Sequence, residues 1–418
     1  MTIHLKKIAV VGAGPAGLAT AIYLHRAGHK VVVFDQFESV KPVGSGLLVQ
    51  PTGLTVLNDL GIARELVSLG QRIDRLQGIT VDTGNSVLAV DYDKTGQRFG
   101  IAVHRAALFS VLHNAALADG VEIQNNTTVN NVLEKEDGAY LFKNGKLDQA
   151  ERWDMIVDTS GAQSEIRNSL MPEEKRKPLQ YGAFWATLNW EGDGFFENAL
   201  QQCYHRASVM IGILPIGCQQ KGGLKKAAFF WSLKPEDVVG VKAAGIGAWK
   251  RDVLGYWPEV SPYLDQIDSF DDLTFADYGH MTLKQPYQGR CVFVGDSAHT
   301  TSPQLGQGAN MALLDARALA HALSKEVSLK EAFENYAASR RMHLRLFQAL
   351  SLALTPFYQS DSRIIPVLRD ILMSTVAKIP PMPALLSRLV CGTLVDPFGK
   401  IGLRECDLLS LFDNQPRK

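Results

Sequence analysis

The sequence IAVVGAGPAGLATAIYLHRAGHKVVVFD, residues 8–35, decides the fold. An apolar run over 8–11 is followed by a glycine turn, an amphipathic segment that ends at Gly28, and a second apolar run that ends at Asp35. This order predicts a strand, a turn, a helix and a second strand parallel to the first, the unit from which dinucleotide-binding sheets are built.

The glycines of the turn have different expected roles. Gly12 lets the chain leave the strand in a tight turn, Gly14 leaves room for a pyrophosphate against the backbone, and Gly17 lets the helix pack closely. The helix N-terminus, which includes Ala16, offers N–H groups and a partial positive charge to the phosphates. Asp35 lies at the distance from the turn where an acid binds a ribose hydroxyl. The stretch predicts a dinucleotide but does not choose between NAD and FAD.

Composition indicates a globular protein of two joined domains, since 418 residues exceed one small core. The 43 basic and 43 acidic residues cancel, so nothing suggests a nucleic-acid partner. Five cysteines are scattered without a CxxC pair, which fits a reducing compartment. No signal peptide and no run of 18 apolar residues is present, so we expect a cytoplasmic protein without a transmembrane segment.

A second informative stretch is RCVFVGDSAHTTSPQLGQGANMALLDARALAHAL, residues 290–323. An apolar strand leads to Asp296, whose carboxylate can accept a hydrogen bond from a ribityl hydroxyl. A loop follows, and a helix is predicted to begin near Gly308. Gly306 and Gly308 let backbone N–H groups and the positive end of that helix face a flavin ring, where they would stabilise the charge of the reduced form. This stretch favours FAD.

Two positions between these stretches have two interpretations each. Gly46 lies in a loop that either runs against a flat ligand or is an ordinary connector. Arg105 begins a predicted helix, where it either reaches the phosphates or ribityl chain of the cofactor or is a surface residue.

Residues 178–272 alternate large and small side chains at the period of a strand and are rich in aromatic groups. One face of such a sheet can cover a substrate. The candidate substrate residues are Trp185, Tyr204, His205 and Tyr287, and His205 and Tyr204 are also the candidate catalytic residues. An aromatic or histidine residue on a strand is more often structural.

The chain resembles the single-component FAD-dependent aromatic hydroxylases of the p-hydroxybenzoate hydroxylase fold, including the ubiquinone-biosynthesis and salicylate-type monooxygenases. The resemblance rests on GAGPAG at 12–17, GDSAH at 295–299 and PQLGQGANMALLDA at 303–316. It implies that the first motif holds the pyrophosphate, that Asp35 (more often Glu in the family) holds the adenosine ribose, that Arg105 lies on the phosphate side, and that Asp296 lies on the ribityl chain. It also implies that Pro303, Gly306, Gly308 and Asn310 lie along the isoalloxazine. The absence of a second GxGxxG fits a nicotinamide nucleotide that binds only transiently.

The turn at Ser160-Gly161 departs from the family, in which it usually reads Asp-Gly and is linked to FAD and NAD(P)H binding. Serine can still accept a hydrogen bond in the turn. The departure puts efficient reduction by NAD(P)H in question.

The expected fold class is α/β: a Rossmann-like FAD-binding domain with a parallel sheet, interleaved with a β-sheet-rich substrate domain and a C-terminal helical segment. The FAD-binding domain is expected at 1–72, 99–172 and 274–345. The substrate domain is expected at 73–98 and 173–273, and the helical region at 346–418.

The predicted activity is hydroxylation of an aromatic or similarly flat apolar molecule with NAD(P)H and O₂ through a flavin C4a-hydroperoxide. One alternative is a reductase or halogenase of the same fold, although the WxWxIP-type halogenase motif is missing. Another is a flavin-loaded protein that sequesters a reactive metabolite. The apolar C-terminal helices leave peripheral membrane contact, a monomer and a homodimer open.

Overall fold

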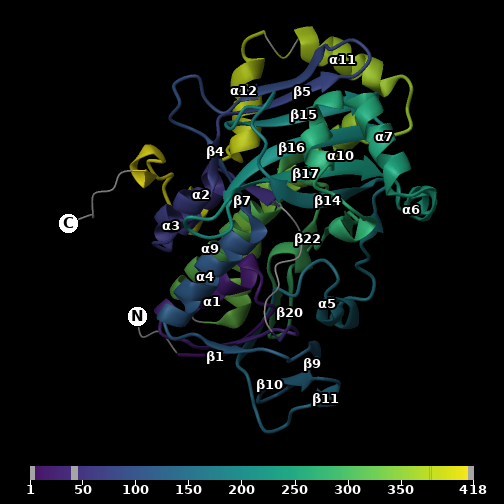
Figure 1. Cartoon of the computed structure of the whole chain (residues 1–418). Coiled ribbons are helices and arrows are strands. Elements are labelled where there is room, and N and C mark those ends of the chain that lie inside the picture. Colours follow the sequence, from purple (N-terminus) through teal and green to yellow (C-terminus); the bar gives the residue numbers. More distant parts are fainter. Residues whose placement is uncertain (1–4, 39–45, 327, 376, 378, 413–418) are drawn as a thin grey trace.

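The computed structural model describes residues 5–38, 46–326, 328–375, 377 and 379–412. Two large sheets organise these residues, and helices cover their faces (Figure 1). The sheet built on residues 8–35 lies in the lower half of the view, and the aromatic sheet lies in the upper half.

The first sheet has the strand order β20-β21-β12-β1-β2-β8, with β20 antiparallel and the other strands parallel. Its strands are β1 (Lys7–Val11), β2 (Lys30–Phe34), β8 (Glu122–Gln124), β12 (Met155–Asp158), β20 (Tyr287–Gln288) and β21 (Cys291–Phe293). Ile8 and Val10 pack into one core and Ala9 and Val11 into another, so both faces are buried. This double burial explains why the strands read as unbroken apolar runs. The strand, turn, helix and strand predicted over 8–35 are confirmed, with helix α1 at Pro15–Arg26.

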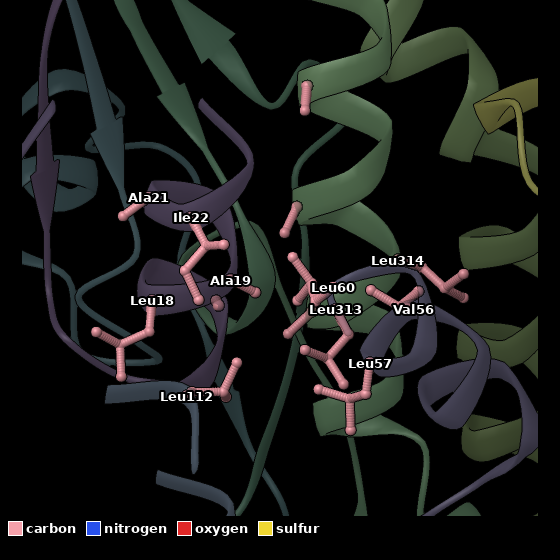
Figure 2. Packing of buried hydrophobic residues seen from close by; sticks show 14 of the residues in the cluster. Leu18, Ala19, Ala21, Ile22, Val56, Leu57, Leu60, Leu112, Leu313 and Leu314 are labelled. Atoms are coloured by element: carbon pink, nitrogen blue, oxygen red, sulfur yellow. The ribbon is translucent and has the colours of Figure 1, made fainter. Parts of the chain in front are cut away.

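Helices fill one face of this sheet. They are α1, α2 (Pro51–Asp59), α3 (Ala63–Leu69), α4 (Arg105–Ala118) and α9 (Gly308–Lys325). Figure 2 shows Leu18 of α1 beside Leu112 of α4, and Leu57 of α2 beside Leu313 of α9. The predicted helix starts at Arg105 and Gly308 are confirmed.

The other face of the first sheet is covered by a hairpin sheet and a short helix. These elements are β9 (Val129–Lys135), β10 (Gly138–Lys143), β11 (Lys146–Leu147) and α5 (Glu165–Leu170). Leu141 and Ile166 pack there against Phe34 and Trp153.

The second sheet has the order β18-β14-β17-β16-β15-β5-β6, in which only β15 and β5 are parallel. Its strands are β5 (Arg75–Thr80), β6 (Ser86–Asp91), β14 (Gly182–Asn189), β15 (Ala199–His205), β16 (Val209–Cys218), β17 (Lys225–Leu233) and β18 (Thr274–Ala276). The segment 274–276 was expected to open a part of the FAD-binding domain. It instead pairs with β14, so the second sheet extends further along the chain than expected.

The two faces of the second sheet have different partners. Phe184, Phe229 and Trp231 pack against helices on the outer side, which are α6 (Val238–Ala244), α7 (Ile246–Tyr256) and α8 (Ser261–Leu264). The opposite face is called here the inner face and is defined by Trp185, Tyr204, Met210 and Phe230. Tyr358, the last residue of the long helix α10, packs against it.

Two small sheets join the large ones. One contains β3 (Gly46–Val49), β7 (Gly100–His104) and β4 (Gln71–Ile73), and the other contains β13 (Lys177–Pro178), β19 (Gly279–Thr282) and β22 (His299–Thr300). Leu48 of β3 packs with Leu214 and Ala228 of the second sheet.

The C-terminal region is helical, as expected, but its first helix begins before residue 346. It consists of α10 (Leu329–Tyr358), α11 (Ile365–Thr375) and α12 (Met382–Cys391). In the part of the chain that the structure describes, no helix has the length and apolar character needed to span a membrane. All five cysteines are free thiols.

Candidate active site

The glycine turn after β1 contains two glycines that the packing of the protein requires, and a third that it does not require. Gly12 has a φ of +104°, and a Cβ there would lie 2.6 Å from the carbonyl oxygen of Thr159. A Cβ on Gly17 would lie 1.8 Å from the carbonyl oxygen of Gly12, so this glycine lets helix α1 pack on the turn. A Cβ on Gly14 would meet nothing within 4 Å. The open position is at the N-cap of α1, whose first N–H groups have no side-chain cap.

Asp35, directly after β2, stabilises this turn through hydrogen bonds. Its Oδ2 accepts a hydrogen bond from the backbone N–H of Ala13 at 2.7 Å, and its Oδ1 accepts one from Phe37 at 3.0 Å. A carboxylate has about four lone-pair sites, so it can still accept a ribose hydroxyl. Asp35 thus has a structural role in addition to the predicted one.

Asp296 follows β21 in a short turn over Gly295–Ser297. Its side chain is exposed, yet burial by the surrounding protein raises the pKa of its carboxyl, with the charges of His299 and Arg105 opposing the rise. Asp296 therefore lies at the carboxyl ends of the parallel strands, where ligands bind in open α/β sheets, and its side chain is accessible there.

Arg105 is the first residue of α4, and its side chain is exposed. Its positive charge acts on Asp296 and on Tyr278, lowering the pKa of each group against the effect of burial. Within the described residues its guanidinium forms no ion pair. Arg105 is thus available to an anionic ligand beside Asp296.

The loop before α9 has one glycine with a positive φ and one in open space. Pro303 begins a short turn over Pro303–Leu305, and Gly306 closes it with a φ of +60°. A Cβ on Gly308, the first residue of α9, would meet nothing within 4 Å. The N-terminus of α9 can therefore be approached closely by a flat group.

Asn310 fixes this loop to β3. Its Oδ1 accepts the backbone N–H of Gln50 at 2.8 Å, and its Nδ2 donates to the carbonyl oxygens of Leu48 and Gly306 at 3.2 and 3.0 Å. Asn310 is fully buried, so its side chain acts on a ligand through the backbone that it positions. Gly46, at the start of β3, is glycine for a packing reason, because a Cβ there would lie 2.5 Å from Ile216.

The N-terminus of α9 is also hydrogen-bonded to the end of α12. The side chain of Gln307, the N-cap residue, donates to the carbonyl oxygen of Val390 at 2.7 Å. The Nε2 of His343 bonds to the carbonyl oxygen of Gly392 at 2.8 Å. Gly392 has a φ of +79°, and a Cβ there would lie 2.9 Å from Thr52.

Asp315 is a buried acid that the sequence analysis did not single out. It lies on α9 and accepts hydrogen bonds from Arg340 at 2.7 Å, from His299 at 2.5 Å and from the backbone of Gly295 at 3.1 Å. Burial alone would raise the pKa of the Asp315 carboxyl, but the charges of His299 and Arg340 lower it to about 2. The network fixes the turn that presents Asp296.

His343 extends this network and makes the stability of the protein pH-dependent. Burial and the neighbouring Arg340 charge lower its pKa from 6.5 to about 3, so it is neutral in the folded protein. The unfolded chain therefore binds more protons between these values, and stability conferred by neutral His343 is present above pH 6.5 and lost as the pH falls toward 3.

We expect the thermal midpoint of the protein to fall on acidification from pH 7 to pH 5, and His343→Gln to reduce that fall. A glutamine can bond to both Arg340 and the Gly392 carbonyl but does not titrate. Leu224→Gln, at a 73% exposed position without a titrating side chain, is the control and should leave the dependence unchanged. Equal slopes for the His343→Gln and wild-type proteins would contradict this role for His343.

Ser160 lies beside a carboxylate despite the departure of its turn from the family pattern. The buried Asp158 at the end of β12 accepts the backbone N–H of Ser160 at 2.9 Å and its hydroxyl at 2.6 Å, and also the hydroxyl of Ser164. Burial raises the pKa of Asp158, while these hydrogen bonds and the charge of Arg167 oppose the rise. Arg167 donates to the carbonyl oxygen of Ser297 at 3.3 Å. An acid therefore supports this turn from two residues earlier.

The inner face presents one polar pair among apolar groups. Trp185 stacks near Phe230, with ring centroids 4.7 Å apart, and its Nε1 donates to the hydroxyl of Tyr278 at 2.7 Å. Burial raises the pKa of Tyr278 to about 12, so it is a neutral donor at physiological pH. Its own proton has no acceptor among the residues that the structure describes. Tyr278 was missed because it lies between strands, outside the aromatic pattern.

The other candidate substrate residues are not brought to this pair. His205 is next to Tyr204 on β15, and consecutive strand residues point to opposite faces. It packs on Tyr256 of α7 with rings 5.2 Å apart and pairs with Asp82 at 3.3 Å, so the structure does not support a catalytic role for it.

Tyr204 lies on the inner face but is fully buried under the C-terminal helices. Its ring is 5.4 Å from Tyr358, and burial raises its pKa well above 10. It is a packing residue and a poor base. Tyr287 lies on the edge strand β20 of the first sheet, with its ring 5.7 Å from Phe333, and does not belong to the second sheet.

These residues fit FAD. The open positions at Gly14 and Gly308 lie at two helix N-termini, Asp35 and Asp296 can accept hydroxyls, and Arg105 supplies a cation. One dinucleotide could extend from the β1 turn past the Gly295–Ser297 turn to α9, since β1, β12 and β21 are neighbours in the sheet.

A protein-family model described as "FAD binding domain" matches residues 6–347. The chain is 26% identical over 343 residues to the aurachin C monooxygenase/isomerase of Stigmatella aurantiaca, covering 80% of this chain and 84% of that protein. It is 27% identical over 355 residues to a putative 2-heptyl-3-hydroxy-4(1H)-quinolone synthase of Rhodococcus erythropolis, covering 82% and 86%.

Among solved structures, HpxO of Klebsiella pneumoniae complexed with FAD and uric acid superposes with a TM-score of 0.77. Its sequence is 17% identical, and the match covers 93% of this chain and 98% of that one. At 17% identity this similarity shows that the two proteins share a fold, and it shows nothing more.

Proposed function

This chain belongs to the FAD binding domain family, and from that premise we propose that it is a monooxygenase. It would hydroxylate a small aromatic or similarly flat apolar molecule with NAD(P)H and O₂. FAD is its cofactor. Relatives named as monooxygenases of aurachin C and of 3-amino-4-hydroxybenzoate support this class of reaction.

One observation carries the proposal. The loop before α9, which leads to the open position at Gly308, contacts the inner face of the second sheet, because the Nε2 of Gln304 lies 3.9 Å from the sulfur of Met210. A flavin hydroxylase needs two parts, a cofactor site and an apolar substrate site. Here the first sheet would supply the cofactor site, and the inner face of the second sheet would supply the apolar site with the Tyr278 hydroxyl as its hydrogen-bond donor.

Residues of this chain would bind and orient the reactants. The N-terminus of α1 and Asp35 would hold the pyrophosphate and ribose, and Asp296 the ribityl chain. The loop that Asn310 fixes would set the ring against the N-terminus of α9. When bound, FAD supplies the electrons that activate O₂.

The inner face would hold the substrate and exclude water from it. Trp185 and Phe230 supply apolar and aromatic surface, and Gln304 contacts Met210 at 3.9 Å from the loop before α9. The Tyr278 hydroxyl would donate its proton in a hydrogen bond to an oxygen of the substrate and fix its orientation.

Tyr278→Phe is expected to lower kcat/KM for the preferred aromatic substrate by roughly tenfold, because one directed hydrogen bond is lost. FAD content should not change, since the phenyl ring remains. Tyr140→Phe is the matched control, because that hydroxyl bonds to Asp137 on a remote hairpin. Unchanged kcat/KM in Tyr278→Phe would remove this residue from the substrate site.

The proposed function is tested by anaerobic reduction. The purified protein is mixed with NADPH or NADH, with and without a panel of phenols, hydroxyquinolones and aromatic carboxylates, and bleaching of the flavin absorbance is followed. Acceleration by one aromatic compound, and conversion of that compound to a product one oxygen heavier once air is admitted, are expected. Reduction that saturates a double bond without oxygen uptake would favour the reductase alternative.

The same experiment tests the turn at Ser160. Protein that dithionite reduces but neither nucleotide reduces would favour a sequestering role. We expect NAD(P)H to reduce the flavin normally. The reason is that the carboxylate of Asp158 supports the turn at Ser160, where the resembling family has an aspartate.

A further inference from the structure

Large aliphatic side chains lie exposed along one face of α11. Ile364, just before the helix, is 79% exposed, and Val367, Leu368 and Ile371 are 57%, 48% and 61% exposed. Their spacing of three, four and seven residues places them on one stripe. Exposed apolar groups scattered singly are normal, but a contiguous stripe marks an interaction site.

The opposite face of α11 is held firmly to the protein. Arg369 is fully buried, and its guanidinium donates to the carbonyl oxygens of Arg206 and Phe357 at 2.9 and 3.1 Å. It also lies 5.2 Å from the ring centre of Tyr204. This inner contact fixes the helix, so the outer stripe faces away from the core.

Two further exposed aliphatic residues follow α11 along the chain. Ile379, three residues before α12, and Leu385, within α12, are 55% and 48% exposed. Figure 1 shows α11 and α12 at the upper end of the molecule, far from the first sheet. The six exposed residues, which we call the α11 surface, are Ile364, Val367, Leu368, Ile371, Ile379 and Leu385.

Two exposed arginines lie beside the α11 surface. Arg363 and Arg388 form no ion pair with any residue that the structure describes. Two acids close to α11 along the chain are engaged, since Asp361 pairs with Lys234 at 2.8 Å and Asp370 with Arg369 at 2.8 Å. An apolar stripe with free cations beside it matches the boundary between the headgroups and acyl chains of an anionic bilayer.

A second copy of the chain fits this surface less well. In a symmetric dimer the same patch meets itself, so the unpaired arginines of both copies would gather at one interface, where their like charges repel. A bilayer with anionic headgroups supplies the missing negative charge.

We propose that the α11 surface docks the protein on anionic phospholipid bilayers, with the aliphatic stripe in the acyl boundary and Arg363 and Arg388 at the headgroups. This inference goes beyond the proposed function and does not depend on it, because its test uses no catalytic activity.

The experiment is co-sedimentation of the flavin-loaded full chain with vesicles of phosphatidylcholine, with and without phosphatidylglycerol. Binding to the anionic vesicles is expected, and Ile364→Ser/Val367→Ser should lower the partition coefficient by about tenfold or more. Leu224→Ser/Val239→Ser removes two exposed aliphatic groups, 73% and 78% exposed, from other surfaces and should bind as wild type.

A second variant separates charge from insertion. Arg363→Gln/Arg388→Gln should lower binding to the anionic vesicles by roughly tenfold and reduce its salt dependence. Wild-type protein that binds neither kind of vesicle, or that loses binding equally with the control pair, would overturn the proposal. A concentration-dependent dimer in sedimentation velocity that the Ile364→Ser/Val367→Ser pair abolishes, without vesicle binding, would assign the surface to a second copy.

Discussion

Valine in place of Gly14 is expected to give a folded protein without colour. The position is open in the structure and lies at the N-terminus of α1, where the FAD pyrophosphate is predicted to lie against the backbone. A branched side chain there would occupy the place of the phosphates, so the Kd for FAD should rise by roughly a hundredfold. Flavin content after purification and titration of the apoprotein with FAD measure this effect.

The matched control is Gly240→Val on α6, since a Cβ on Gly240 also meets nothing within 4 Å and its φ is ordinary. That variant should remain yellow. A thermal midpoint of Gly14→Val apoprotein equal to that of wild-type apoprotein would show that the fold is intact. Full flavin content in Gly14→Val would remove the β1 turn from the cofactor site.

Asp315→Asn is expected to have the largest effect on stability. The carboxylate is the buried partner of both Arg340 and His299, and removing one member of a buried ion pair leaves an uncompensated charge. Such losses lower the free energy of unfolding by about 3–5 kcal/mol. Denaturation of the FAD-saturated protein by urea measures the change.

The control for Asp315→Asn is Glu197→Gln, which breaks the exposed pair with Lys225 at 3.0 Å. That change should lie within about 0.5 kcal/mol. Because Asp315 also accepts the Gly295 N–H, the affinity for FAD should fall with Asp315→Asn and not with Glu197→Gln. Equal stability of the two variants would show that the network contributes little.

The parts of the fold that could be predicted from the sequence are those that local patterns determine. The strand, turn and helix over residues 8–35 follow from unbroken apolar runs around glycines, and the start of α9 follows from the glycines before it. The place of Asp296 at the end of β21 could be predicted because an acid directly after a buried strand has one position in such a sheet. Each of these inferences needs only neighbours along the chain.

The residues that escaped prediction depend on contacts between distant segments. Tyr278 joins the candidate site only because β18 pairs with β14 and brings it to Trp185, 93 residues away. His343 receives its role from a carbonyl 49 residues downstream. The role of Asp158 could not be predicted from residue 160, because its carboxylate reaches the turn from the end of β12, two residues earlier.

One pair of candidate residues could have been narrowed to a single residue from the sequence. Tyr204 and His205 are adjacent in an alternating segment, so at most one of them could face the substrate side of the sheet. The burial of Tyr204 could not be foreseen, because the helices that cover it come more than a hundred positions later in the chain.

The segment 390–392, at the end of α12, is hydrogen-bonded through its backbone to Gln307, the N-cap residue of α9, and to His343 of α10. Gln307 and His343 bond there to backbone carbonyls, which any amino acid supplies, so these two hydrogen bonds place no demand on the side chains at 390 and 392. Val390 and Cys391 are buried in the core, so only apolar side chains of similar size fit there. At Gly392 the left-handed backbone and the tight approach to Thr52 exclude a side chain. A chimera that exchanges α12 between relatives should therefore keep its flavin when that glycine and the apolar residues at 390 and 391 are retained.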